Sequence, residues 1–258
     1  MSTFLFNEYV FGPIKSRRLG SSLGLNLLST TEKVCNYDCI YCECGNTYSL
    51  KNGKTAFVDK ALFLYQLEER LKTCIENNTP VDTITFAGNG EPTLHPHFLS
   101  ITLKVVEYRN QYFPNAKIAV LTNGMALSKI RVQKSLKKID KAIIKLDAGT
   151  NQGMQLIDQP KGSYSIDKLV NNIKQFDGEV IIQTMFLSGV VNGKSFDNSS
   201  KQEVKAWLEL LKDINPTEVM LYSIDRDTPT DGLQKINREK LQLIAKEVEA
   251  LNIKTQVV

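Results

Sequence analysis

A repeated unit of short apolar strand, turn and amphipathic helix constrains the fold of this chain more than any other feature. The expected strands cover residues 23–28, 83–87, 118–121, 142–146, 180–186 and 218–222, with a possible closing edge strand at 254–258. Helical periodicity covers residues 59–76, 96–108, 128–139, 165–175, 201–212 and 238–251. Strands that alternate with helices predict a parallel sheet with right-handed crossovers. Six such units predict an α/β fold, a partial (β/α)6 barrel.

No linker or low-complexity stretch divides the 258 residues, so we expect a single domain. Residues 1–22 are interpreted as an N-terminal extension and residues 23–258 as the partial barrel. The extension carries Arg17 and Arg18, which either belong to a solvated arm or lie near an anionic group, because paired guanidiniums suit phosphate or carboxylate.

Composition indicates an ordinary soluble globular protein, with 42% hydrophobic and 23% charged residues. The net charge of +4 is too small to imply nucleic-acid binding by itself. The sequence has no apolar run near the ~18 residues that span a bilayer. The start, MSTFLFNEYVFGP, lacks a basic region and a cleavage site typical of signal peptides. We therefore expect a cytoplasmic protein without a membrane partner.

Three cysteines in the segment CNYDCIYC, at Cys35, Cys39 and Cys42, are spaced C-x3-C-x2-C. A [4Fe–4S] cube is normally held by four thiolates, so three leave one iron open to a ligand. Three alternatives compete with this interpretation. The cysteines could share a buried helix face, they could form a zinc knuckle together with Cys44, or they could form disulfides. The loop-forming neighbours, the tight spacing and the odd number of five cysteines argue against these in turn. Cys74 falls on a buried helix face and is predicted to be a core thiol.

Several predicted strands end in polar residues, and the carboxyl ends of barrel strands are where chemistry occurs. The second strand ends in Gly88-Asn89-Gly90-Glu91-Pro92, where glycines allow close backbone approach and Glu91 supplies a carboxylate for an ammonium group. The fourth ends with Lys145 and Asp147 on one face, either a ligand-binding pair or a structural ion pair. Asn123 either binds a ligand or adopts a left-handed turn. Asp225 and Arg226 either reach a substrate or form a surface pair.

These segments, together with FGPIKSRRLGSSLGLNL, KLDAGT and YSIDRDTP, resemble the radical S-adenosylmethionine (SAM) superfamily, and within it the wyosine-synthase-related Fe–S oxidoreductases. The resemblance implies one [4Fe–4S] cluster and SAM as cofactors. The open iron would chelate the methionine end of SAM, and one electron would cleave the sulfonium to give a 5′-deoxyadenosyl radical. The chain departs from the superfamily's Gly-Gly-Glu-Pro motif by the inserted Asn89.

The resemblance also implies roles for individual residues. The metal ligands would be Cys35, Cys39 and Cys42, with Lys145 and Asp147 completing the catalytic set. The cofactor-binding set would be Tyr41, Gly88, Asn89, Gly90, Glu91, Pro92, Asn123, Lys145, Asp147, Gln183, Gly189 and Tyr222.

The expected reaction begins with hydrogen abstraction from a small or nucleoside-like substrate, with an electron donor such as flavodoxin or ferredoxin. One alternative is a radical-activating enzyme for a partner protein, and another is a transfer-RNA-modifying enzyme of the wyosine type. Wyosine synthases carry a second cluster on cysteines upstream of the SAM motif, and this sequence has no cysteine before Cys35. A basic stripe of Arg131, Lys134 and Lys138 is interpreted as a solvated face, with RNA contact as the alternative.

Overall fold

The computed structural model describes residues 4–47, 57–226 and 228–258. Within them, a ten-stranded sheet follows the order β1-β2-β3-β4-β5-β6-β8-β10, with β7 and β9 attached to β6. The strands that pair in parallel are β2 (Gly20–Leu25), β3 (Thr83–Phe86), β4 (Lys117–Thr122), β5 (Lys141–Lys145), β6 (Ile181–Val191), β8 (Glu218–Ser223) and β10 (Lys254–Val257). The mostly parallel sheet confirms the predicted α/β fold, including the closing edge strand.

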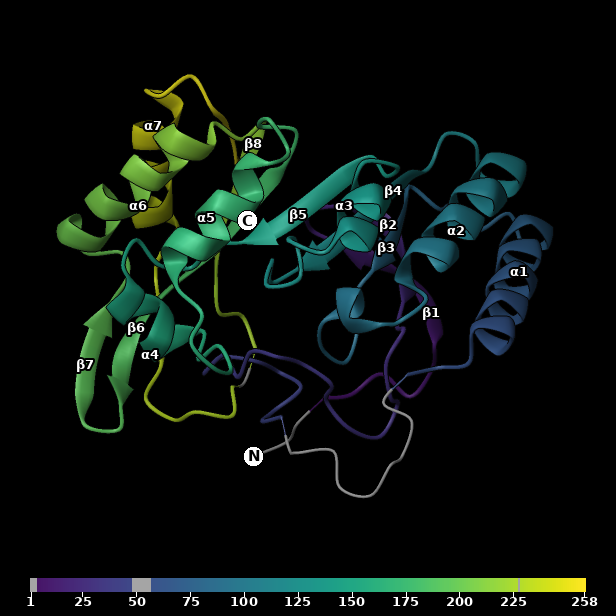
Figure 1. Cartoon of the computed structure of the whole chain (residues 1–258), viewed down its shortest axis with the longest axis horizontal. Helices are drawn as coiled ribbons and strands as arrows, with labels where there is room; N and C mark the ends of the chain where they lie inside the picture. The colour runs from purple at the N-terminus through teal and green to yellow at the C-terminus, as the bar shows by residue number, and fades with distance from the viewer. Residues whose placement is uncertain (1–3, 48–56, 227) are drawn as a thin grey trace.

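Helices cover the outside of this sheet (Figure 1). They are α1 (Lys60–Glu76), α2 (Phe98–Tyr112), α3 (Ile130–Leu136), α4 (Asn151–Ile157), α5 (Ile166–Lys174), α6 (Lys201–Ile214) and α7 (Arg238–Glu249). Helices α1 to α3 contact one another in sequence, as do α5 to α7, so two groups of helices flank the barrel. Asp59 caps α1, and Cys74 lies on the buried face of that helix, as predicted. None of the described helices is long and apolar enough to cross a membrane.

Part of the predicted N-terminal extension pairs with the sheet. Strand β1 (Val10–Ser16) pairs antiparallel with β2, and β2 begins at Gly20, before the predicted residue 23. Gly12 and Pro13 lie within β1, where its register shifts between Phe11 and Ile14. A glycine and a proline inside a strand conceal its pattern, because both residues normally interrupt sheet pairing.

Strand β6 continues beyond the predicted residue 186 and forms antiparallel pairs with β7 (Lys194–Asp197) and β9 (Gln234–Lys235). Neither β7 nor β9 was predicted from the sequence. The turn between β6 and β7 contains Asn192 and Gly193, both with positive φ. This pair is a strong hairpin signal when strands flank it.

Alternate residues of each barrel strand face inward and outward. The inward residues Ala119, Ile143, Ile181 and Met220 form a small apolar cluster together with Leu19, separate from the main core. Their strand neighbours Ile118, Ile144, Ile182 and Val219 pack in the main core. The small cluster therefore fills the barrel interior at one level and forms a floor for the space beyond it.

Candidate active site

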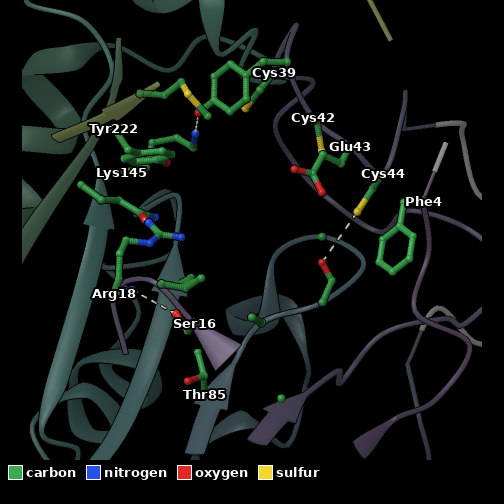
Figure 2. A pocket seen from close by; sticks show the side chains of 18 of the residues that line it. Phe4, Ser16, Arg18, Cys39, Cys42, Glu43, Cys44, Thr85, Lys145 and Tyr222 are labelled. Atoms are coloured by element: carbon green, nitrogen blue, oxygen red, sulfur yellow. Dashed lines mark hydrogen bonds between the residues drawn. The ribbon is translucent and has the colours of Figure 1, made fainter. Parts of the chain in front are cut away.

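A cavity of about 440 Å³ lies where the strands of the barrel end. That volume is within the range of sites for small ligands and cofactors. Figure 2 shows Lys145 and Tyr222 on one side of the open space, with Cys42, Glu43 and Cys44 on the other. Eleven of the predicted site residues line this cavity, namely Cys35, Cys39, Tyr41, Cys42, Gly88, Gly90, Glu91, Asn123, Lys145, Gln183 and Tyr222. Asn89, Pro92, Asp147 and Gly189 lie outside its lining.

Cys35, Cys39 and Cys42 are free thiols in a loop, so the helix-face and disulfide alternatives do not hold. Among the described residues, no three Cys, His, Asp or Glu side chains surround a single point as the ligands of one metal ion would. A tetrahedral zinc ion requires such a point. A four-iron cube takes one thiolate at each of three iron corners, and the three cysteines line one cavity.

The surroundings of the three thiols favour the deprotonated, thiolate form at Cys42 and disfavour it at Cys35 and Cys39. A hydrogen bond from Cys44, helped by the positive charge of Lys33, lowers the pKa of Cys42 to about 6 despite burial. Burial, with the nearby Glu91 carboxylate, raises the pKa of Cys35 to about 11. Burial also raises the pKa of Cys39. Thiolate is the form that binds metal, and these surroundings favour it most at Cys42.

Lys33 is a site residue that the sequence analysis missed. It is only 4% exposed, and its Nζ donates to Asp38 Oδ1 at 3.1 Å and to the Gly45 carbonyl at 2.8 Å. Burial lowers the pKa of Lys33, but the thiolate charges of Cys42, Cys35 and Cys39 raise it by more. A buried lysine near the three cysteines would offset part of the negative charge of their thiolate forms. The sequence feature that could have identified Lys33 as a site residue is its position two residues before Cys35.

The glycine-rich turn after β3 is joined to the cysteine loop through the backbone. Val34 N donates to the Asn89 carbonyl at 2.9 Å, and Glu91 N donates to the Val34 carbonyl at 3.0 Å. Gly90 has φ +137°, and a Cβ there would stand 1.9 Å from the Val34 carbonyl oxygen. Only glycine permits this approach. The cysteine loop and the turn therefore hold each other in position.

The inserted Asn89 has a side chain with a structural role. It is fully buried, and its amide binds both the N–H and the carbonyl of Phe6, at 2.8 Å each. The same amide nitrogen donates to the Ser29 carbonyl at 2.8 Å. Asn89 thus fastens the N-terminal segment to the turn. This segment brings Phe4, Phe6 and Phe11 to the wall of the cavity, a contribution that the sequence analysis did not foresee.

Glu91 reaches the cavity although it is only 2% exposed. Its Oε1 accepts from Thr93 N at 3.0 Å, from Thr93 Oγ1 at 2.5 Å and from Thr122 Oγ1 at 2.8 Å. Its Oε2 accepts from Asn123 N at 2.7 Å. Burial raises the pKa of Glu91, and these hydrogen bonds partly counter that rise. Because a carboxylate oxygen can accept about two hydrogen bonds, Oε2 keeps capacity for one further donor.

Asn123 lies beside the first cysteine and is not in a left-handed conformation, which belongs instead to Gly124 at φ +79°. The Asn123 amide donates to Asn36 Oδ1 at 2.7 Å and approaches Cys35 Sγ at 3.7 Å. Tyr37 N also donates to Cys35 Sγ at 3.4 Å. Hydrogen bonds to a cysteine sulfur tune the reduction potential of the cluster that it ligates.

Lys145 and Asp147 form the ion pair that was one of the two expected alternatives, at 2.8 Å. The Tyr41 hydroxyl contacts both side chains, and Lys145 also lies 3.8 Å from Asp158. Burial lowers the pKa of Lys145, while Asp147, Cys39 and Asp158 raise it well above its usual value. Asp147 is inaccessible and also accepts from Met185 N, so it positions Lys145, whose side chain lines the cavity.

The remaining predicted residues divide between cavity and scaffold. Gln183 and Tyr222 line the cavity. Pro92 begins a short 3-10 helix after Glu91, and Gly189 lies where β6 pairs with β7, against the backbone of Gly232. The structure therefore places Gly189 on the hairpin side of β6.

Two arginines beside the site, Arg17 and Arg226, form ion pairs with carboxylates. Arg17 contacts Asp225 at 3.1 Å, and Arg226 contacts Glu43 of the cysteine loop at 2.7 Å, with all four side chains largely exposed. In the basic stripe, Arg131 donates to the His95 carbonyl, whereas Lys134 and Lys138 are exposed. Two of the three cations in the stripe are therefore exposed, and the third is partly buried.

We expect Gly90→Ala to destabilise the protein and to impair cluster assembly. An alanine at this φ costs on the order of 1–3 kcal/mol, and its methyl group would also displace the Val34 carbonyl. Each kcal/mol lowers the melting temperature of a protein of this size by about 2–4 °C. Gly193→Ala is the matched control, because Gly193 also has positive φ, +73°, but has nothing within 4 Å. Equal melting temperatures and iron contents for the two variants would contradict the role assigned to this contact.

The sequence matches the Radical SAM superfamily model over residues 31–192. The chain is 33% identical over 250 residues to a protein named GTPase Obg from Brachyspira hyodysenteriae, covering 95% of this chain and 34% of that protein. It is 32% identical over 222 residues to a UPF0026 protein of Helicobacter pylori, covering 84% of this chain and 66% of that protein. The chain thus spans about a third and about two thirds of these two relatives.

Two solved structures share the fold. A radical SAM methyltransferase from Sphaerobacter thermophilus superposes with a TM-score of 0.66 at 16% identity, covering 92% of this chain and 65% of that one. The structure of TYW1 with a lysine–pyruvate adduct gives a TM-score of 0.62 at 14% identity, covering 90% and 75%. At these identities the likeness establishes the fold alone. Together with the match over residues 31–192, it shows that the chain belongs to the radical SAM superfamily, whose members are enzymes that use a [4Fe–4S] cluster and SAM.

Proposed function

We propose that this protein is a radical SAM enzyme that initiates its reaction by hydrogen abstraction from a small or nucleoside-like substrate. The observation that carries the proposal is that three free thiols line one cavity together with the Glu91 carboxylate and the Lys145 ammonium. Cys35, Cys39 and Cys42 would hold the cluster. When bound, the cluster and SAM supply reductive cleavage of the sulfonium, which yields a 5′-deoxyadenosyl radical that takes a hydrogen atom from the substrate.

The chain's own residues would orient SAM by its methionine end. Glu91 presents a carboxylate oxygen with one hydrogen-bonding position left, which suits the amino group. Lys145 presents an ammonium held by Asp147 and Tyr41, which suits the carboxylate. Such charge-assisted hydrogen bonds are short and directional, so two of them fix the orientation of the group. The N-terminal phenylalanines that Asn89 fastens would help to exclude water from the cavity.

The partners follow from this chemistry. The reaction requires a one-electron donor such as flavodoxin or ferredoxin and a substrate that enters the cavity. Transfer RNA is not favoured as a substrate, because the net charge of +4 is modest. Activation of a partner protein would show itself as a glycyl radical on that partner in electron paramagnetic resonance.

The test is SAM cleavage by the anaerobically reconstituted and reduced protein. We expect 5′-deoxyadenosine and methionine as products, formed faster when a cell-extract fraction containing the substrate is added. Deuterium carried from a labelled extract into 5′-deoxyadenosine would identify the substrate by its lost hydrogen. A protein with its full complement of iron and no SAM cleavage would contradict the proposal.

A further inference from the structure

We propose that Arg18 forms an anion-binding subsite for a carboxylate or phosphate group of the substrate. Arg18 lies in the turn between β1 and β2, which enters the barrel. The Ser16 hydroxyl accepts from Arg18 N at 3.3 Å and from Leu19 N at 3.1 Å, which fixes the turn. Leu19 packs in the apolar floor of the barrel, so Arg18 stands directly above this floor, within the cavity lining.

Two contacts hold the guanidinium of Arg18 in place. Its Nη1 donates to Gln183 Oε1 at 2.8 Å, and its Cζ lies 4.7 Å from the centre of the Tyr222 ring. Figure 2 shows Arg18 below Lys145 and Tyr222, beside the open space and away from Cys42 and Cys44. A guanidinium that is already ordered by stacking and by one hydrogen bond loses little freedom when it binds a ligand.

The charge of Arg18 sets it apart from the other cations that line the cavity. Each of the others has a carboxylate partner within 4 Å, in the pairs Arg17–Asp225, Lys33–Asp38, Lys145–Asp147 and Arg226–Glu43. In the described part of the chain, Arg18 has no such partner, and its one side-chain hydrogen bond goes to a neutral amide. Arg18 is partly buried, and a cation that loses contact with water without a counter-charge gains most from an anionic ligand.

The geometry selects the kind of ligand. Arginine offers several N–H donors in a planar fork that matches the two oxygens of a carboxylate or phosphate. The nearby wall offers hydroxyl and apolar groups, including the hydrogen-bonded pair Ser22–Thr85 at 2.8 Å and Met185. This subsite rests on the proposed function, because it takes Glu91 and Lys145 as the binders of SAM and leaves Arg18 for the substrate.

The test compares Arg18→Met with Arg17→Met. Methionine keeps the packing on Tyr222 and removes the charge, while Arg17 is an exposed neighbour already paired with Asp225. Inorganic phosphate and acetate, titrated separately at constant ionic strength, serve as probes, with the melting temperature and calorimetry as readouts. We expect saturable binding of at least one anion to wild type and to Arg17→Met. The affinity of Arg18→Met for that anion should be lower than that of wild type by roughly 10-fold or more. Arg18→Lys, which keeps the charge but not the fork, should bind with intermediate affinity.

The two probes distinguish the two kinds of anionic group that a substrate could carry. A preference for acetate indicates a carboxylate substrate, and a preference for phosphate indicates a phosphorylated one. Equal binding to Arg18→Met and Arg17→Met, or no saturable binding to wild type, would overturn the proposal. A loss of SAM affinity in Arg18→Met would also overturn it by placing Arg18 in the cofactor site. Anion binding is measurable without SAM cleavage, so a failure of the proposed function would be seen separately, as wild-type protein that contains iron but does not cleave SAM.

Discussion

Replacing Cys35, Cys39 or Cys42 with alanine is expected to abolish SAM cleavage and to remove most of the iron from anaerobically reconstituted protein. All three thiols face one cavity, and each is expected to hold one iron of the cluster. A cube held by only two thiolates has lost a third of its protein ligands, and a [4Fe–4S] cluster depends on those thiolates. Wild type should hold close to four irons per chain, as measured by iron and sulfide analysis.

Cys74→Ala is the control for these three variants, because Cys74 is 3% exposed on the buried face of α1. This change should lower stability slightly and leave the iron content and SAM cleavage intact. Cys44→Ala tests a thiol beside the cluster ligands, since Cys44 lines the cavity and its thiol donates to the Gly88 carbonyl at 3.8 Å. We expect Cys44→Ala to keep its iron. Loss of the cluster in Cys74→Ala, or its retention in Cys39→Ala, would refute the ligand assignment.

The sequence predicted the barrel strands because each one is a local apolar run with a turn after it. Strands β3, β4, β5 and β8 begin within one residue of their expected starts. The prediction failed where the pairing depends on distant segments. Strand β1 is stabilised by β2 and contains Gly12 and Pro13, so its own residues do not indicate a strand.

In the site, too, residues recognisable from local sequence were predicted, whereas contacts between distant segments were not. The cysteines, Glu91 and Lys145 were identifiable from residue type, spacing and position at a strand end, and the structure brings them to one cavity. The side chain of Asn89 could not be assigned in this way, because its partners Phe6 and Ser29 are 83 and 60 residues away in the sequence. Arg18 likewise meets Gln183 across 165 residues. Local pattern predicts where a functional group stands along the chain, whereas only the closed barrel determines what that group faces.

Glu91→Gln and Lys145→Met are each expected to weaken SAM binding by roughly 10- to 100-fold while leaving the iron content near normal. The two residues would bind the amino and carboxylate groups of SAM, and a hydrogen bond to a charged group contributes about 1.5–3 kcal/mol. Since about 1.4 kcal/mol corresponds to a tenfold change in affinity, the loss of one such bond gives this range. Equilibrium binding of SAM to the oxidised, cluster-loaded protein measures it without turnover.

Both residues also support the fold, so the experiment must separate binding from stability. Glutamine at position 91 would set an amide N–H₂ against some of the donors that the carboxylate now accepts, from Thr93, Thr122 and Asn123. Methionine at position 145 would leave Asp147 buried without its cation, and breaking a buried pair in this way costs about 3–5 kcal/mol.

The double variant Lys145→Met, Asp147→Asn separates the two effects. It removes both charges together, and an asparagine at position 147 can still accept from Met185 N as Asp147 Oδ1 does at 2.8 Å. We expect the double variant to melt at a higher temperature than Lys145→Met and to bind SAM equally weakly. If SAM affinity returned together with stability, Lys145 would be a structural partner of Asp147 and not a ligand for SAM. If Glu91→Gln also bound SAM with wild-type affinity, the assignment of both charged ends would be wrong.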